Sequence, residues 1–370
     1  MKILLCFGTR PEAIKMAILI HTLKKQKDFK VVVCVTAQHR EMLDQVLDFF
    51  ELVPDYDLNL MQPNQTLNTL SAAILSKMDN VLKEVKPDLV LVHGDTTTSS
   101  IVALSAFHLG IKVGHVEAGL RSYNKRAPFP EEINRQFTSK IADIHFAPTK
   151  GAMQNLLDEG IQLNNIVHTG NTVIDALLWT IEKIKQKGFC NREIVLLKKM
   201  IPLDKKIILV TGHRRENYGL GFSNVCDSLL TIAKRDDVRI VYPVHLNPNV
   251  KGIVNEKLAN QKNVYLISPV TYPAFVWLMM QSFLIVTDSG GIQEEAPTLG
   301  KPVLITRDIS ERPEGLDAGF STIVGTNQLD IEKQIIHHLE EFNGFGNIQN
   351  PYGTGIASKV IVDFLLNTYR

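Results

Sequence analysis

The sequence is poor in cysteine, with four in 370 residues, and no two of them form a C-x-x-C pair. Scattered cysteines are typical of a reducing compartment and offer no structural zinc site. An excess of charge of either sign is also missing, since 40 lysines and arginines stand against 39 aspartates and glutamates. This balance argues against a general nucleic-acid binder and against a polybasic membrane-binding surface.

Long apolar runs are missing too, so we expect no membrane-spanning segment, and the first residues predict a strand rather than a signal peptide. No Gly-x-Gly-x-x-Gly turn follows that strand, so we expect no nicotinamide cofactor. His93, His115 and His245 fall near strand ends, but their spacing matches no compact metal motif, and we expect no metal. The sequence therefore predicts a cytoplasmic protein without cofactor or metal.

What the sequence does contain is a regular alternation of apolar runs and helix-like segments. Buried parallel strands are predicted at residues 3–7, 31–36, 89–93, 113–116 and 144–147, and again at 207–211, 239–243, 264–267, 284–287 and 302–305. Helix-like stretches lie between them, for example at residues 11–25, 41–50, 67–85 and 99–109. Two such series predict an α/β fold with two doubly wound, Rossmann-like domains.

The domain boundary is predicted near Thr169, Gly170 and Asn171. Residues 1–169 then form an N-terminal domain and residues 170–352 a C-terminal domain. Residues 353–370 predict a last helix that packs back on the N-terminal domain. The charged, weakly patterned residues 183–206 are expected to be a surface excursion between the domains.

Ligands of open α/β sheets bind at the carboxyl ends of the strands, and the polar clusters of this sequence fall at such ends. In the most informative one, Ser289, Gly290 and Gly291 lead from a buried apolar run into a helix. Adjacent glycines let the backbone approach a ligand closely, and the helix start favours a phosphate. Glu295, about one turn further on, is placed to bond sugar hydroxyls. An ordinary strand–turn–helix corner is the plain alternative.

Cationic residues follow other predicted strands. Arg10 and Lys15 come after the first strand and suit phosphate oxygens, although solvated surface charge is the simpler explanation. His213 and Arg214 form a second cationic group, suited to a diphosphate, and Arg312 adds to the same rim. We therefore predict an anionic ligand.

Carboxylates stand at three further strand ends, as Asp95, Glu117 and Glu131. Each has an ordinary explanation: Asp95 as a helix N-cap, Glu117 as the partner of Arg121, and Glu131 as a complement to a helix dipole. Acids from separate strand ends are nevertheless the groups that proton transfer requires.

Eight motifs follow one another along the chain, in the order GTRPE, HGDTTT, HVEAGLR, PFPEEINR, HRREN, TDSGGIQEE, GKPVL and ERPE. Over essentially the whole chain, this ordered set resembles one known family, the bacterial non-hydrolysing UDP-N-acetylglucosamine 2-epimerases. The resemblance implies two Rossmann-like domains facing a central cleft in the glycosyltransferase-B arrangement, and a homodimer. It implies reversible conversion of UDP-GlcNAc into UDP-ManNAc by elimination of UDP to 2-acetamidoglucal and re-addition. Such an enzyme supplies cell-surface polysaccharide precursors and uses neither NAD nor metal.

The resemblance also implies roles for residues that match the family motifs. Catalytic roles are implied for Asp95, Glu117, Glu131 and His213. Substrate contacts are implied for Arg10, Lys15, Asp95, Glu117, His213, Arg214, Phe275, Ser289, Gly290, Gly291, Glu295 and Arg312, with Phe275 on the uracil side.

Some members of the family are activated by UDP-GlcNAc, and Gln38, His39 and Gln65 match that pattern. Glu41 and Asn64 stand where activated members often carry Gln and Arg, which weighs against activation here.

Three other functions remain open at this stage. A hydrolysing epimerase would release free ManNAc and UDP. A retaining glycosyltransferase of the same fold would need an acceptor, and a nucleotide-sugar sensor would leave its ligand unchanged. The carboxylates weigh against the sensor, and the full-length resemblance weighs against the transferase.

Overall fold

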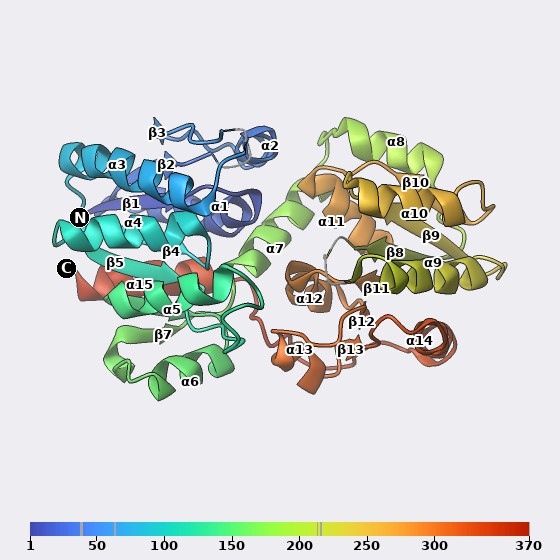
Figure 1. The fold of residues 1–370 in the computed structure, drawn as a ribbon. Coiled ribbons are helices and arrows are strands. Elements are labelled where there is room, and N and C mark those ends of the chain that lie inside the picture. Colours follow the sequence, from blue (N-terminus) through green and yellow to red (C-terminus); the bar gives the residue numbers. More distant parts are fainter. Residues whose placement is uncertain (38–39, 63, 213, 215–216, 370) are drawn as a thin grey trace. The chain divides into compact units, whose positions relative to one another are not determined.

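The computed structural model describes residues 1–37, 40–62, 64–212, 214 and 217–369. The chain divides into two compact units, which are drawn in Figure 1. Unit 1 comprises Met1–Trp179 and Tyr352–Arg370, and unit 2 comprises Thr180–Pro351. Unit 1 is thus assembled from two separate stretches of the chain, and unit 2 lies between them in the sequence.

Among the described residues, unit 1 holds a parallel sheet in the order β3-β2-β1-β4-β5-β6-β7. Its strands are β1 (Lys2–Phe7), β2 (Lys30–Val35), β3 (Tyr56–Asp57), β4 (Leu89–His93), β5 (Lys112–Val116), β6 (Ile144–Ala147) and β7 (Ile166–His168). The connecting helices are α1 (Arg10–Lys24), α2 (Arg40–Phe49), α3 (Leu67–Val85), α4 (Thr97–His108), α5 (Glu131–Ile141), α6 (Lys150–Asp158) and the short 3-10 helix η1 (Leu163–Asn165). Helix α7 (Thr172–Lys185) begins in unit 1, and its residues after Trp179 belong to unit 2.

The core of unit 1 forms because helices cover both faces of the sheet. In β1, the side chains from Ile3 to Phe7 are all fully buried, as expected for a parallel strand with both faces covered. Helix α15 (Ala357–Thr368), drawn in red among the blue and green elements in Figure 1, packs against α1. Phe364 of α15 meets Phe146 of β6 edge to face, with ring centroids 5.9 Å apart. The last helix therefore completes the core of unit 1.

Unit 2 holds a second parallel sheet, in the order β10-β9-β8-β11-β12-β13 for the part of the chain described. Its strands are β8 (Lys206–Thr211), β9 (Val238–Pro243), β10 (Val264–Ile267), β11 (Leu284–Thr287), β12 (Val303–Ile305) and β13 (Ser321–Ile323). Its helices are α8 (Arg192–Met200), α9 (Leu220–Ile232), α10 (Pro248–Leu258), α11 (Tyr272–Gln281), α12 (Gly290–Glu295), the 3-10 helix η3 (Ala296–Leu299), α13 (Pro313–Asp317) and α14 (Gln328–Glu341).

Both sheets confirm the predicted doubly wound α/β fold, and each of the ten predicted strands is found within one residue of its expected bounds. In unit 1, β1 lies between β2 and β4, and in unit 2, β8 lies between β9 and β11. Connections leave these central strands in opposite directions, which opens a crevice at their carboxyl ends. The loops after β1 and β4, and after β8 and β11, are therefore where ligands are expected.

Residues 183–206, expected as a surface excursion, are mostly exposed or half-buried and contain helix α8, which was not predicted. Asn191 caps this helix by accepting a hydrogen bond from the Ile194 amide at 3.0 Å. Ile194 and Leu197 of α8 are buried, and α8 packs on α11. The many charges of the segment hid this short apolar stripe. In the described part of the chain, no helix is both long and apolar enough to cross a membrane.

Candidate active site

At the crevice of unit 1, a buried carboxylate joins two loops. Glu12, on the first turn of α1, is only 2% exposed. Its Oε2 accepts hydrogen bonds from the Gly8 amide at 3.0 Å, the Thr9 amide at 2.8 Å and the Thr9 hydroxyl at 2.8 Å. Its Oε1 accepts from the Thr96 hydroxyl at 2.7 Å. Burial raises the pKa of Glu12 to about 7, although the hydrogen bonds from Thr96, Gly8 and Thr9 oppose the rise.

Glu117 stands one residue beyond β5, and side chains from other elements contact its carboxylate. Its Oε2 accepts hydrogen bonds from the Lys15 ammonium and, at 3.0 Å, from the Asn171 side chain. The His93 Nε2 lies 3.7 Å from the same oxygen. Lys15 and Glu117 are each 8% exposed, so they form a buried ion pair. Lys15 is therefore a buried, paired cation and not a solvated surface charge.

The backbone of Glu117 is unusual, because its φ of 62° lies in the left-handed region. This conformation costs a residue with a Cβ about 1–2 kcal/mol, and such residues gather at functional sites. Gly94, at φ 64°, lies beside it, since a Cβ there would stand at the van der Waals distance of 3.6 Å from Glu117 Oε1. The loop after β4 and the acid after β5 are therefore in close contact.

Arg121 is not the partner of Glu117, and this alternative is wrong. Its Nε and Nη2 donate to the two oxygens of Glu159 at 2.6 and 2.8 Å, and Nη2 also donates to Ser139 at 2.9 Å. The fork of a guanidinium fits a carboxylate with two parallel bonds, whereas the compact ammonium of Lys15 suits the single Glu117 oxygen.

Asp95 does not cap α4, so the plain explanation for this residue is also wrong. Thr96 is the N-cap, and its hydroxyl accepts from the Ser99 amide at 3.0 Å. The Asp95 carboxylate instead lies 2.5 Å from the Arg135 guanidinium, and its backbone oxygen accepts from the Asn134 side chain at 2.9 Å. Helix α5 therefore holds Asp95 through two neighbouring residues.

The two glutamates that open α5 differ in environment. Glu132 is fully buried and accepts from the amides of Ser122 at 2.9 Å and Tyr123 at 3.1 Å, so it shapes the preceding loop. Glu131 is half-buried and lines a hollow of about 770 Å³ within unit 1. The hollow is lined by Thr9, Met61, Gln62, Asn64, Gln65, Leu67, Leu70, Asp95, Thr96, Thr97, Pro130, Glu131 and Asn134. Two of the predicted catalytic acids thus share one hollow with Gln65.

The histidine of β5, His115, contacts the backbone of a neighbouring loop. His115 is fully buried, its Nε2 lies 2.7 Å from the Gly94 carbonyl, and burial lowers its pKa to about 3. A neutral ring that donates Nε2–H to that carbonyl satisfies this geometry. In the described ranges, no three histidine, cysteine or acidic side chains are grouped to hold a metal ion.

In unit 2, a fully buried acid organises the loops at the crevice. Asp288 follows β11, and its Oδ2 accepts from the Arg214 amide, in the loop after β8, at 2.8 Å. The hydroxyls of Thr211 and Thr287 lie 2.6 Å apart, and Thr287 accepts from the Ser289 amide at 3.0 Å. The ends of β8 and β11 are thereby joined beside the Ser-Gly-Gly turn.

The short helix α12 carries two acids with defined partners. Glu295 accepts a hydrogen bond from the Tyr272 hydroxyl at 2.6 Å, and Phe275 stands one turn further along the same helix α11. Glu294 is paired with Arg312, whose guanidinium carbon would lie 3.8 Å from a Cβ at Gly290. The predicted nucleotide-binding residues Phe275, Gly290, Glu295 and Arg312 therefore belong to connected elements of unit 2.

The remaining predicted residues fall into two groups. Arg10 is exposed at the start of α1, and Gln65 donates from its side chain to the Leu60 carbonyl at 2.9 Å. Gln38, His39 and His213 lie outside the described residues.

Four residues at the carboxyl edge of the unit 1 sheet were not predicted as site residues, namely Glu12, Thr96, Asn171 and Arg135. Glu12 is the last residue of the GTRPE motif, and an acid five residues past a buried strand is the signal that could have singled it out. Asn171 stands at the predicted domain boundary, so its side chain was not connected with Glu117.

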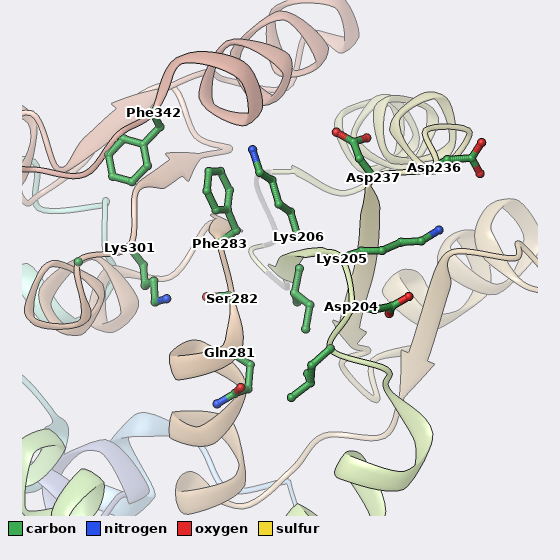
Figure 2. A pocket seen from close by; sticks show the side chains of 13 residues that line it. Asp204, Lys205, Lys206, Asp236, Asp237, Gln281, Ser282, Phe283, Lys301 and Phe342 are labelled. Carbon is green, nitrogen blue, oxygen red and sulfur yellow. The ribbon is translucent and has the colours of Figure 1, made fainter.

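A second hollow, of about 700 Å³, lies at the amino ends of the strands of unit 2, away from every predicted site residue (Figure 2). Two of its acids are paired with arginines outside its lining, Asp204 with Arg239 and Asp237 with Arg235. Lys206 lies 4.4 Å above the ring of Phe283. These pairings give the hollow no set of groups directed at a common ligand.

Two doubly wound parallel sheets, one with acids and the other with glycines and arginines at the strand ends, define an α/β protein of the glycosyltransferase-B-like type. The family model described as UDP-N-acetylglucosamine 2-epimerase matches residues 21–366. The UDP-N-acetylglucosamine 2-epimerase of Escherichia coli K12 is 53% identical over 371 residues, which cover 99% of each chain. The chain therefore belongs to the UDP-N-acetylglucosamine 2-epimerase family.

Solved structures agree with this assignment. The UDP-GlcNAc 2-epimerase from Neisseria meningitidis, bound to UDP-GlcNAc, aligns with a TM-score of 0.94 at 49% identity and covers 100% of both chains. The enzyme from Methanocaldococcus jannaschii, in complex with UDP-GlcNAc and UDP, aligns with a TM-score of 0.85 at 34% identity over 99% of this chain and 100% of that one.

Proposed function

We propose that this chain is a non-hydrolysing UDP-GlcNAc 2-epimerase, which interconverts UDP-GlcNAc and UDP-ManNAc without NAD or metal. Membership of the family supports the substrate. The observation that carries the chemistry is the set of acids at one edge of the unit 1 sheet, where Asp95 and Glu131 share a hollow and Glu117 lies beside Gly94. Inversion at a carbon requires one group to remove a proton and another to return it from the opposite face.

The proposed reaction begins with elimination. C2 of the sugar has no neighbouring carbonyl, so its proton is only weakly acidic and must leave together with a leaving group. A carboxylate takes the C2 proton, the C–H electron pair forms the C1–C2 double bond, and the C1–O bond breaks toward UDP. The products held by the enzyme are 2-acetamidoglucal and UDP. Re-addition reverses these changes: a UDP oxygen bonds to C1, and an acid delivers a proton to the other face of C2.

Glu117 suits the part of an ionised acid in this reaction. Lys15 and Asn171 both donate to it, and donors favour the charged form of a carboxylate. Asp95 is likewise paired with a cation, Arg135. The division of base and acid among Asp95, Glu117 and Glu131 is decided by experiment.

Departure of UDP requires positive charge at the diphosphate. We assign this role to Arg214, Arg312 and the Ser289–Gly291 turn of unit 2, with His213 and Arg10 as further contributors. Preorganised donors stabilise the charge that develops on the leaving oxygen. Glu295 and Phe275 are assigned to the ribose and uracil sides.

The experiment is NMR of UDP-GlcNAc incubated in D₂O with the purified protein and nothing else. We expect UDP-ManNAc that carries deuterium at C2, because the proton passes through a side chain that exchanges with solvent. Product that retains protium at C2 would indicate internal hydride transfer and contradict the mechanism. Free ManNAc with UDP would identify a hydrolysing enzyme, and turnover that begins only with an added acceptor would identify a transferase.

Further parts of the proposal concern the assembly and regulation. We include a homodimer, a cytoplasmic location and a supply of precursors for cell-surface polysaccharide. Light scattering of the purified protein tests the dimer. Activation by UDP-GlcNAc through Gln38, His39 and Gln65 would appear as a lag or sigmoidal dependence when the reaction starts from UDP-ManNAc alone.

A further inference from the structure

The feature behind this inference is the bond between Glu12 and Thr96, two residues that are 84 positions apart. The bonds from Glu12 to Gly8 and Thr9 are local and belong to the N-terminal cap of α1. A cap of this kind satisfies the first amides of a helix and requires no partner from elsewhere. The Thr96 bond is therefore an additional function of the same carboxylate.

We propose that Glu12 is a positioning residue that fixes the loop after β4, and with it Asp95, against the loop after β1. The inference rests on the proposed function, since it gives Asp95 a part in the reaction. Glu12 itself touches neither substrate nor reacting atoms in this assignment.

The geometry shows how the position of Asp95 depends on its neighbours. Thr96 directly follows Asp95, and its hydroxyl donates to Glu12 while it accepts from the Ser99 amide. From the other direction, α5 holds Asp95 through Asn134 and Arg135. The acid is thus fixed by two helices from different parts of the chain. If the contact to one helix is lost, the contact to the other helix can shift Asp95 from its position.

The contacts of Glu12 suit a side chain that has two accepting oxygens. All four contacts to its oxygens come from donors, two amides and two hydroxyls. A neutral amide at this position offers one accepting oxygen, and its NH₂ group would face either the Thr96 hydroxyl or the backbone amides. We call the contact of Glu12 with Thr96, Gly8 and Thr9 the junction. Glu12→Gln keeps the volume of the side chain and disturbs either the bond from Thr96 or the bonds from the two backbone amides.

The test compares the kinetics of Glu12→Gln and Thr96→Val. The two variants change the two partners of the same bond, so if one variant fails to fold, the other can still be measured. We expect both to lower kcat about 10- to 100-fold with KM within about threefold, because a small displacement of a catalytic group acts on the transition state. Thr96→Ser keeps the hydroxyl and should restore most of the rate. The double variant should be no slower than the slower single variant.

The matched control is Thr149→Val. Thr149 caps α6 in the same unit by the same bond, from the Ala152 amide at 3.0 Å, and has no part in the Glu12 junction. It should lower Tm as much as Thr96→Val and leave kcat unchanged. If Thr149→Val slows the reaction equally, or if both junction variants keep kcat within twofold, the proposal is overturned.

A second readout does not depend on turnover. In a crystal structure of Glu12→Gln, we expect the Asp95 carboxylate to leave its 2.5 Å contact with Arg135 or to shift with the loop after β4. An unchanged Asp95 would overturn the positioning role. An unmodified protein that converts no UDP-GlcNAc would instead contradict the proposed function, and the structural comparison would still decide the role of Glu12.

Discussion

In unit 1, the loops at the central crevice present acids whose partners are side chains from other elements, such as Lys15 with Glu117 and Arg135 with Asp95. In unit 2, the buried Asp288 serves the backbone, since it accepts the Arg214 amide, and the turn that follows is built of glycine. Both units use the same parallel sheet and the same crevice. The fold therefore decides where chemistry takes place, and the side chains decide which chemistry it is.

This contrast indicates a division of labour. Cationic partners hold these acids in position, as proton transfer at a defined carbon requires. A glycine turn next to arginines suits the diphosphate, on which negative charge develops as UDP leaves. Changes to the acids of unit 1 should thus act on kcat, and changes to the ribose-side contact of Glu295 in unit 2 should act on KM.

The largest effect is expected from Asp95→Asn and Glu117→Gln. Each removes a proton-transferring group, so kcat should fall about 10²- to 10⁴-fold while KM changes little. Initial rates of UDP-ManNAc formation by NMR measure this. Asp79→Asn, which alters an exposed acid on α3, is the control and should be neutral. Near-normal kcat in both variants would show that the acids of unit 1 do not perform the chemistry.

Next in size is the loss of stability in Lys15→Met. It leaves the buried Glu117 without its cation, which should cost unit 1 about 3–5 kcal/mol. The measurement is urea unfolding followed by Trp179, which packs on Phe50 with ring centroids 5.0 Å apart, in a Trp277→Phe background.

Two further variants test the cause of the loss of stability in Lys15→Met. Addition of Glu117→Gln to Lys15→Met should recover much of the loss, because no unpaired buried charge remains. Arg312→Met breaks the pair with Glu294 in unit 2 and should leave the Trp179 transition unchanged. A shift of that transition by Arg312→Met would show that the two units do not unfold separately.

A smaller effect is expected from the pH dependence of Glu12→Gln. Burial raises the pKa of Glu12 from 4.5 to about 7, so the folded state binds this proton more tightly than the unfolded chain. The stability from this proton is complete below pH 4.5 and is lost as the pH rises to about 7. Gln does not titrate, so the free energy of unfolding of Glu12→Gln does not fall in this way. Relative to the unchanged protein, it should rise by about 3 kcal/mol between pH 4.5 and about 7. A difference that stays constant with pH would contradict the buried, titrating Glu12.

The smallest effect is expected in unit 2, from Glu295→Ala. Loss of one hydrogen bond from a charged acceptor should raise KM about tenfold and leave kcat nearly unchanged. Tyr272→Phe removes the 2.6 Å bond to Glu295 but keeps the carboxylate, so its KM should rise less. A fall in kcat with normal KM for Glu295→Ala would break the proposed division between the units.

The predicted strands were accurate because parallel strands covered on both faces are short, continuous apolar runs, as in Ile3–Phe7. The edge strands β3, β7 and β13 have only two or three residues, too few for a pattern. Helix α8 was missed because charges surround its two buried positions, Ile194 and Leu197.

The candidate site was predictable as a set of positions and less so as a set of contacts. Strand ends and motifs placed Asp95 and Glu117 at the correct edge of the sheet. Their partners Arg135 and Lys15 come from other helices, and no local pattern specifies which cation meets which acid. The contact between Glu12 and Thr96 is of the same kind, since it depends on how two loops lie in the folded sheet.

The position of α15 in unit 1 also has a consequence for biosynthesis. During translation, all of unit 2 leaves the ribosome before Ala357–Thr368, the segment that packs on α1 and brings Phe364 to Phe146. Unit 2 can therefore close as soon as its own strands are made. Unit 1, although synthesised first, completes its core only when the last helix has been made, so its apolar surface stays exposed for longer during synthesis.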